Sequence, residues 1–276
     1  MFWIYDIPSW ALGFVIVGSL LLCSCIGLII SRDWIYRYFK ITHDTLDSIN
    51  GFFSAMGMLY GLLMGLVAVS AWENYQNVGS IVDIEATVIA QLYCDVSTLQ
   101  EPSKTRLQND LQDYLHYIID VNWPAHRKGI IKRGGQLILT RFIKTATTYQ
   151  PANAQQQIIS AEVFTAYNSL IDARRARLQA IDTGLPAQLW VVIIIGGGIM
   201  VLMSYFIYMP SLRTHVLMTA VFSTLLGLMI FLIASLDHPF RGEVSVSSDA
   251  YKAVLDNVKD FDPGYVTTIV SNSPAK

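Results

Sequence analysis

The sequence has 276 residues, of which 53% are hydrophobic and only 14% are charged. Soluble domains carry roughly 25% charged residues, so this composition excludes an ordinary soluble protein. The formal net charge of −2 argues against a nucleic-acid binder, and Cys23, Cys25 and Cys94 supply neither a disulfide framework nor a zinc ligand set.

The first predicted membrane helix covers residues 8–30, where 23 consecutive residues carry no charge. At about 1.5 Å rise per residue, a helix of this length spans the roughly 30 Å hydrocarbon core. No basic residue precedes it, so we predict a retained span and not a secretory signal. Aromatic residues flank the span as interfacial belts do: Trp3, Tyr5, Trp10, Trp34 and Tyr36.

The second predicted membrane helix covers residues 49–72, whose 24 residues carry no charge. Gly57, Gly61 and Gly65 are spaced four apart and therefore share one helix face. Such a face lets another backbone approach closely, which is how membrane helices associate. We predict that these glycines pack against a neighbouring helix. The alternative is a plain membrane anchor that tolerates glycine.

The face of this helix opposite the glycines is the predicted pore-lining face. At about 100° per residue it contains six residues: Phe52, Met56, Leu59, Leu63, Leu66 and Ser70. In an oligomer, a ring of such apolar side chains forms a constriction that gates by dewetting. The alternative is that this face contacts lipid or a neighbouring helix. Glu73, at the end of the span, either selects cations at a pore mouth or pairs with a basic residue.

Residues 73–186 are predicted to form a helical extramembrane domain with 11 basic and 11 acidic residues. Its first part, up to Ser97, continues the second span as a helix. A second helix begins near Pro102 and ends at Trp123-Pro124, and others cover residues 136–148 and 153–182. A basic cluster in the last of these either attracts anions or lipid headgroups, or forms a solvated face: Arg174, Arg175 and Arg177.

The third and fourth predicted spans, residues 187–209 and 216–236, form a helical hairpin. Residues 237–276 follow as an extramembrane tail with a short helix over residues 248–258. The tail begins with four polar residues, for which one hypothesis is an ion-pair latch, a metal site or a proton-sensitive gate: Asp237, His238, Arg241 and Glu243. One histidine with two carboxylates is too few ligands to predict a metal, and a capped helix exit with a local salt bridge is the alternative.

The sequence carries no motif of a known enzyme class. It has no HExxH, no GxSxG and no glycine-rich phosphate loop, and its five histidines are scattered. We therefore predict no enzymatic activity and no cofactor. The fold class is an all-α membrane protein with four spans in residues 1–72 and 187–236 and a helical domain between spans two and three.

Several motifs together resemble the bacterial bestrophin-like family of membrane proteins. They are IYDIPSW at residues 4–10, LVAVSAWENY at 66–75, GLPAQLW at 184–190, and DHPFRGE at 237–243 followed by SVS at 245–247. The resemblance covers residues 2–258. It implies a pentamer in which the second helices surround a central ion pathway, with anions as the preferred ions. Animal bestrophins have a calcium site formed by an acidic run after the Pro-Phe-Gly-Glu turn. Here Arg241 interrupts that turn and Val244-Ser245-Val246-Ser247 replaces the acidic run, which argues against calcium control.

Four spans place the N-terminus, residues 73–186 and the tail on one side of the membrane. The short loops on the other side carry four basic residues: Arg32, Arg37, Lys40 and Arg213. The opposite side carries five basic residues near the spans, but they are spread over longer segments. The charge count alone therefore favours cytoplasmic loops. The resemblance implies a cytosolic helical domain instead, and we follow the resemblance.

The function hypothesis is a bestrophin-like ion channel, anion-conducting, in the bacterial inner membrane as a multi-pass protein. Its partners are the lipid bilayer, inorganic ions with anions such as chloride preferred, and further copies of itself in a homopentamer. The alternative is a non-conducting oligomeric scaffold that binds a partner through its helical domain.

Overall fold

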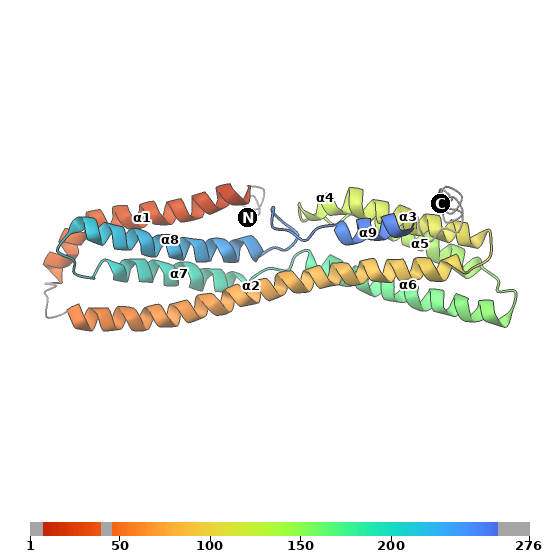
Figure 1. Ribbon diagram of the computed structural model, residues 1–276, viewed down its shortest axis with the longest axis horizontal. Coiled ribbons are helices and arrows are strands. Elements are labelled where there is room, and N and C mark those ends of the chain that lie inside the picture. Colours follow the sequence, from red (N-terminus) through yellow and green to blue (C-terminus); the bar gives the residue numbers. More distant parts are fainter. Residues whose placement is uncertain (1–7, 40–45, 259–276) are drawn as a thin grey trace, which may run out of the picture. The chain divides into compact units, whose positions relative to one another are not determined.

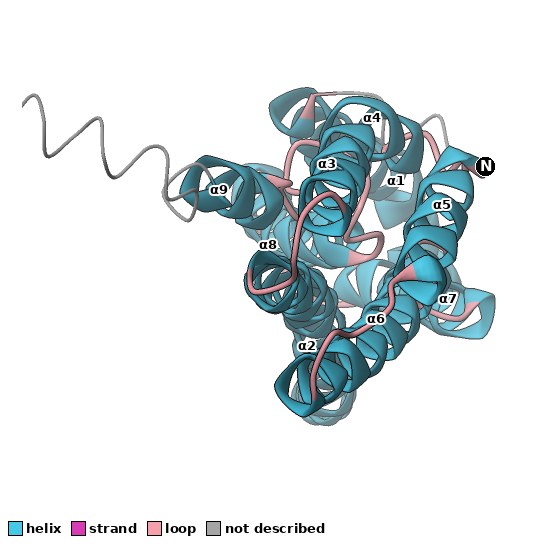
Figure 2. Ribbon diagram, turned by 90° about the vertical axis from the view of Figure 1, so that its right-hand side faces the viewer, coloured by secondary structure: helices cyan, strands magenta, loops and turns pink. Residues whose placement is uncertain are grey.

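The structure is a computed structural model that describes residues 8–39 and 46–258. All elements in these ranges are helices, and Figure 2 shows them joined by loops. The chain divides into two compact units, a membrane unit (Met1–Tyr75 and Gly184–Ser245) and a helical domain (Gln76–Thr183 and Val246–Lys276). The expected interfacial positions of Trp3 and Tyr5, the charge of Lys40 and the end of the tail lie outside the described residues.

Within residues 8–39 and 46–258, four helices are long and apolar enough to cross a membrane. They are α1 (Ser9–Tyr38), α2 (Leu46–Ser97), α7 (Ala187–Ser204) and α8 (Leu212–Leu236). The prediction of an all-α membrane protein with four spans is therefore confirmed. Figure 1 shows α1, α7, α8 and the first part of α2 running alongside one another.

The hairpin between α7 and α8 differs from the predicted bounds. α7 ends at Ser204, five residues before the predicted end, and α8 begins at Leu212, four residues early. The Ser211 side chain accepts a hydrogen bond from the backbone N–H of Thr214 at 3.5 Å, so it caps the first turn of α8. Polar capping, which hydropathy does not detect, therefore sets the start of this span.

α2 is one unbroken helix of 52 residues, visible along its full length in Figure 1. At about 1.5 Å per residue its axis is roughly 78 Å long. The apolar first part contributes to the membrane unit and the second part to the helical domain. The structure thus confirms the predicted continuation of the second span as far as Ser97.

Side chains from three helices form a hydrophobic core in the membrane unit. One core cluster joins α2, α7 and α8, and its fully or largely buried members are Met64, Val67, Ile193, Leu226, Ile230 and Ile233. The Tyr60 hydroxyl donates to the carbonyl oxygen of Ile193 at 2.8 Å. α1 lies directly against α8, where a Cβ at Gly227 would be 3.0 Å from Cα of Val17. Glycine at this position therefore permits the close contact.

The helical domain contains the second part of α2 and the remaining helices. They are α3 (Ser103–His116), the π-helix η3 (Tyr117–Asn122), α4 (Trp123–His126), α5 (Gly134–Thr148), α6 (Ala154–Ala180) and α9 (Asp249–Val258). The prediction that Trp123-Pro124 ends a helix is wrong, because the chain stays helical to His126. Pro124 lies in the first turn of α4, directly after the π-helix η3.

The core of the helical domain forms where α3, α5 and α6 present apolar side chains to each other. Leu107, Leu111 and Leu115 repeat every four residues along α3 and are completely buried. The ring of Phe142 on α5 stacks on that of Tyr167 on α6, with centroids 5.6 Å apart. This packing fixes the backbone positions from which the polar side chains of the helical domain extend.

Candidate functional site

The first candidate site is the uncovered face of α2 in the membrane unit. Phe52, Leu59 and Leu66 expose 61%, 70% and 64% of their surface, and Ser70 is also exposed. Met64, Val67 and Ala71 are buried, and Met64 and Val67 pack in the core cluster with residues of α7 and α8. The exposed residues therefore follow one another along a face that the rest of the described chain leaves open.

The six residues predicted to line a pore do not share one environment. Met56 and Leu63 are partly buried, and Leu63 packs against the core cluster of α2, α7 and α8. Leu59, by contrast, is mostly exposed. Glu73 is exposed three residues after Ser70, at the end of the apolar part of α2.

The three glycines predicted to pack against a helix lie elsewhere on α2. No described atom lies within 4 Å of a Cβ built on Gly61 or Gly65, and at Gly57 only Cε of Met200 approaches, at 3.5 Å. Close contacts within the chain occur instead at Gly196, where such a Cβ would be 2.5 Å from the Tyr60 ring. The glycines of α2 are thus open within one chain, and their packing partner remains a prediction.

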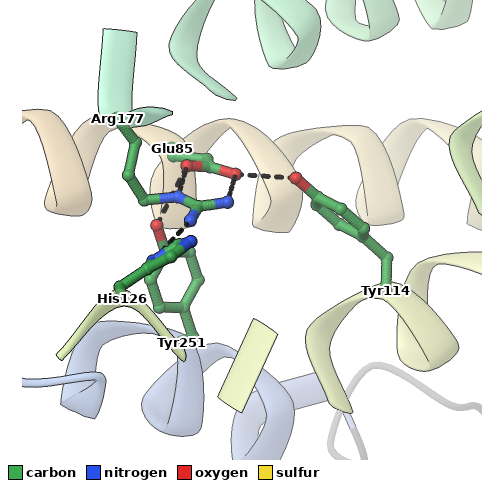
Figure 3. A network of polar contacts seen from close by, with 5 residues as sticks. All are labelled: Glu85, Tyr114, His126, Arg177 and Tyr251. Carbon is green, nitrogen blue, oxygen red and sulfur yellow. Dashed lines mark hydrogen bonds and ion pairs between the residues drawn. The ribbon is translucent and has the colours of Figure 1, made fainter. Parts of the chain in front are cut away.

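The second candidate site is a buried polar network in the helical domain, shown in Figure 3. The Arg177 guanidinium donates to the Glu85 carboxylate twice, from Nε to Oε2 at 2.5 Å and from Nη2 to Oε1 at 3.2 Å. Both side chains are completely buried. The Tyr114 hydroxyl donates to Oε1 at 2.8 Å and the Tyr251 hydroxyl to Oε2 at 3.0 Å. Glu85 therefore accepts four hydrogen bonds, which compensates the cost of burying its charge.

His126 completes the network on the other side of Arg177. Arg177 Nη1 lies 3.3 Å from His126 Nδ1, a geometry in which the guanidinium donates to a neutral imidazole. Burial and the neighbouring charge of Arg177 lower the pKa of His126 to about 3. Burial and the charge of Glu85 raise the pKa values of Tyr114 and Tyr251 well above 10, so both phenols keep their protons. The network is consequently one ion pair solvated by neutral donors and acceptors.

The structure does not gather the three arginines of α6 into one exposed cluster. Arg177 is buried against Glu85, and Arg174 is largely buried and donates to Oε1 of Gln136 at 2.8 Å. Only Arg175 is exposed, 3.4 Å from Asp172. A helix turns about 100° per residue, so neighbouring positions face different directions. Arg177 thus exposes no surface in this chain and pairs with Glu85 instead of lying beside Arg175 at the surface.

The polar residues after α8 are tied to the starts of two spans. Asp237 is buried and accepts hydrogen bonds from the Leu185 N–H at 2.5 Å and from the Trp190 indole at 3.1 Å. The Glu243 carboxylate accepts a hydrogen bond from the N–H of Ser9, the first residue of α1, at 3.0 Å. Carboxylates at helix N-termini satisfy free N–H groups and complement the helix dipole. These contacts fit the capped-exit alternative.

His238 and Arg241 lie in the same turn. His238 Nε2 is 3.7 Å from Oδ2 of Asp237, and its ring packs against Gly184, where a Cβ would be 2.6 Å away. Arg241 is largely buried, and Gly242 after it has a φ of 80°, a backbone conformation that favours glycine. Among the described residues, no group of three or more His, Cys, Asp or Glu is placed to bind a metal ion.

Sequence reasoning missed the network that surrounds the Glu85–Arg177 ion pair. One signal was present, because Glu85 falls on the same helical stripe as Val78, Val82 and Ile89, which are all buried. An acid on an apolar stripe indicates a buried charge that needs partners. The partners could not be found this way, since Tyr251 lies 166 residues from Glu85.

Comparisons with known proteins agree on one family. A family model described as a bestrophin-like domain matches residues 18–251. A search of curated proteins found no match.

Solved structures of similar fold include a bacterial bestrophin homolog from Klebsiella pneumoniae. It has 12% identity, a TM-score of 0.65, and coverage of 90% of this chain and 97% of that one. A point variant of a bestrophin homolog from the same organism has 14% identity, a TM-score of 0.60, and coverage of 90% and 98%. At such low identity these structures show a common fold. The match of the family model over most of the sequence shows that this chain belongs to the bestrophin-like family.

Proposed function

We propose that this protein is an ion channel, anion-conducting, in which α2 of each subunit of a homopentamer lines a central pore. The observation that carries the proposal is the open apolar face of α2, from Phe52 to Ser70. In a single membrane-embedded chain this face would contact lipid. Around a symmetry axis, the same face from several subunits surrounds a narrow passage whose apolar side chains control wetting.

Leu59 is the strongest candidate for the narrowest point. It is 70% exposed, whereas Leu63, one turn further, packs partly against the core of its own chain. A rotation of the helix that brings Leu63 to the axis would have to disturb that packing. The neck of the channel is therefore centred on Leu59, with Leu63 contributing at its edge.

The anion preference rests on the resemblance to bestrophins, because the uncharged stretch of residues 49–72 favours neither sign of charge. Glu73 is the first charged residue after this stretch and is exposed. A ring of five such carboxylates at the pore mouth opposes anion entry unless basic groups compensate them. Measuring both ion types separately is therefore essential.

The test is ion flux into proteoliposomes containing the purified protein, with chloride and potassium gradients applied in separate experiments. We expect protein-dependent chloride flux that rises severalfold in Leu59→Ala and less in Leu63→Ala, because a shorter side chain widens an apolar neck. The matched control is Leu225→Ala, an exposed leucine on α8 away from this face. It should leave flux unchanged.

Three results would count against the proposal. Flux that is equal in wild type, Leu59→Ala and Leu225→Ala would remove Leu59 from the neck. Potassium flux without chloride flux would reverse the proposed selectivity. No flux of either ion from a well-assembled oligomer would favour a non-conducting scaffold that binds partners through the helical domain.

A further inference from the structure

The helical domain contains a long segment of one charge sign. Residues 121–161 include six basic residues and no acidic one, although the whole region between spans two and three is balanced. Four of the six lie in the loop that joins α4 to α5, residues 127–133, which we call the basic loop. Its charged members are Arg127, Lys128, Lys132 and Arg133, and all four are exposed.

The basic loop has a defined backbone. After α4, Gly129 has a φ of 68°, and its N–H donates to the carbonyl of His126 at 2.8 Å. The N–H of Ile130 donates to the carbonyl of Ala125 at 2.9 Å. These two bonds are the Schellman pattern that ends a helix at a left-handed glycine. At the other end, the N–H of Gly134 donates to the Tyr117 hydroxyl at 3.0 Å, so the loop is fixed on both sides.

Two isoleucines form the apolar centre of the basic loop. Ile130 and Ile131 expose 51% and 46% of their surface, between the two pairs of cations. Within residues 8–39 and 46–258, none of the four cations makes an ion pair or a side-chain hydrogen bond. The basic loop therefore presents both an apolar surface and positive charges that are available to bind a partner.

We propose that the basic loop docks on the surface of a lipid bilayer that contains anionic headgroups. Cations near such a surface are attracted to the phosphates, and apolar side chains at the tip enter the boundary between headgroups and acyl chains. An acidic protein surface would match the cations but would leave the two isoleucines without an apolar environment. The bilayer accommodates both.

The connections of the chain also favour lipid as the partner. The indole of Trp123, at the start of α4, donates to the carbonyl oxygen of Val246 at 3.3 Å. Val246 follows Leu236, the last residue of α8, by only ten residues. Trp123, in the helix that precedes the basic loop, is thus bonded to a residue that lies only ten positions along the chain from a membrane span. Docking of the loop does not depend on ion conduction.

The test uses the full-length protein reconstituted into vesicles of phosphatidylcholine alone or of phosphatidylcholine with phosphatidylglycerol. Cys23, Cys25 and Cys94 are replaced by alanine, and Ile131→Cys receives an environment-sensitive fluorophore. We expect a blue-shifted emission and quenching by lipids with a spin label near the headgroup, only in vesicles with phosphatidylglycerol. The same label at Thr147→Cys, an exposed position in the last turn of α5, should stay in water.

A matched pair of charge variants separates local docking from a general charge effect. Each cation near an anionic surface strengthens docking about fivefold, so Lys132→Gln with Arg133→Gln should weaken docking roughly 25-fold. Arg106→Gln with Lys144→Gln removes two exposed cations elsewhere in the domain and should change little. High salt should release the loop, because screening shortens the range of the attraction.

Three results would overturn the proposal. A label at residue 131 that stays in water in both kinds of vesicle would exclude lipid contact and leave the basic loop for an acidic protein partner. Equal quenching with and without phosphatidylglycerol, or equal loss in both double variants, would show that anionic headgroups are not recognised by these cations. Amide hydrogen exchange of residues 127–133 in the unlabelled protein provides the same comparison if the label disturbs the loop.

Discussion

At the scale of single residues, the ion pair of Glu85 and Arg177 is the most constrained feature of the helical domain. Both groups are completely buried, and each donor or acceptor around them comes from a different helix: α2, α3, α4, α6 or α9. A buried ion pair contributes little net stability, because desolvation offsets attraction, but loss of one partner leaves a charge without compensation. The network therefore specifies how these helices meet.

Substitution of Arg177 tests this role. We expect Arg177→Gln to destabilise the domain by about 3–5 kcal/mol, because Glu85 keeps a buried charge without its counter-ion. Arg175→Gln is the control, since Arg175 is exposed and its pairing with Asp172 is worth about 0–1 kcal/mol. Thermal unfolding in detergent, followed by circular dichroism, measures both. Similar melting temperatures for the two variants would contradict the structural role of Arg177.

His126 gives the network a pH dependence. Its pKa is about 3 in the folded protein and about 6.5 when exposed, so unfolding takes up a proton between these values. Stability should therefore be full above pH 6.5 and fall by up to about 1.4 kcal/mol per pH unit towards pH 3. His126→Gln keeps an acceptor for Arg177 and does not titrate. Denaturant unfolding at several pH values should show a shallower acid slope for this variant, and an identical slope would count against His126 as the titrating group.

At the scale of elements, the glycines of α2 and α8 have different surroundings within the chain. The sequence pattern Gly57, Gly61, Gly65 is a stronger helix-association signal than the lone Gly227, yet the close contact within the chain is made at Gly227. A single glycine suffices where two backbones cross once. The repeated pattern in α2 remains open to a partner outside the chain, which sequence alone could not distinguish from an internal contact.

Alanine substitutions separate these two uses of glycine. Gly227→Ala places a Cβ 3.0 Å from the backbone of Val17 and should cost about 1–3 kcal/mol through overpacking of α1 on α8. Gly61→Ala meets no described atom within 4 Å and should leave the melting temperature of the chain unchanged. If Gly61 instead packs between subunits, its alanine variant will shift the oligomer distribution in native mass spectrometry while the fold of each chain is retained.

At the scale of the whole molecule, long apolar and amphipathic stretches made the fold predictable. The four spans, the continuation of α2 to Ser97 and the helices between spans two and three follow from hydropathy and helical periodicity. Two details of the helix bounds were not predictable from the sequence. They are the start of α8, which the Ser211 cap sets, and the continuation of the helix through η3 to Pro124. Both depend on hydrogen bonds that hydrophobic periodicity does not detect. The members of the buried network were not predictable either, because they come together through contacts between positions that are 29 to 166 residues apart.

Membrane orientation is a whole-molecule prediction that hydropathy cannot make. We expect the helical domain to face the cytoplasm, as the family resemblance implies. In a background without the three native cysteines, Thr147→Cys in intact spheroplasts should react with a membrane-impermeant maleimide only after permeabilisation. A cysteine in the α7–α8 turn, Ser211→Cys, should react in both conditions. The reverse pattern would place the helical domain outside.

The buried network also constrains the order in which the protein can be made. Tyr251 is synthesised 166 residues after Glu85, and spans three and four lie between Arg177 and Tyr251 in the chain. While the ribosome is still producing those spans, Glu85 and Arg177 lack one of their neutral donors, and the cavity that α9 fills is unfinished. Completion of the helical domain therefore has to wait until the α7–α8 hairpin has been synthesised. The helical domain is therefore the last part of the protein to be completed, although α3 to α6 are translated before the membrane helices α7 and α8.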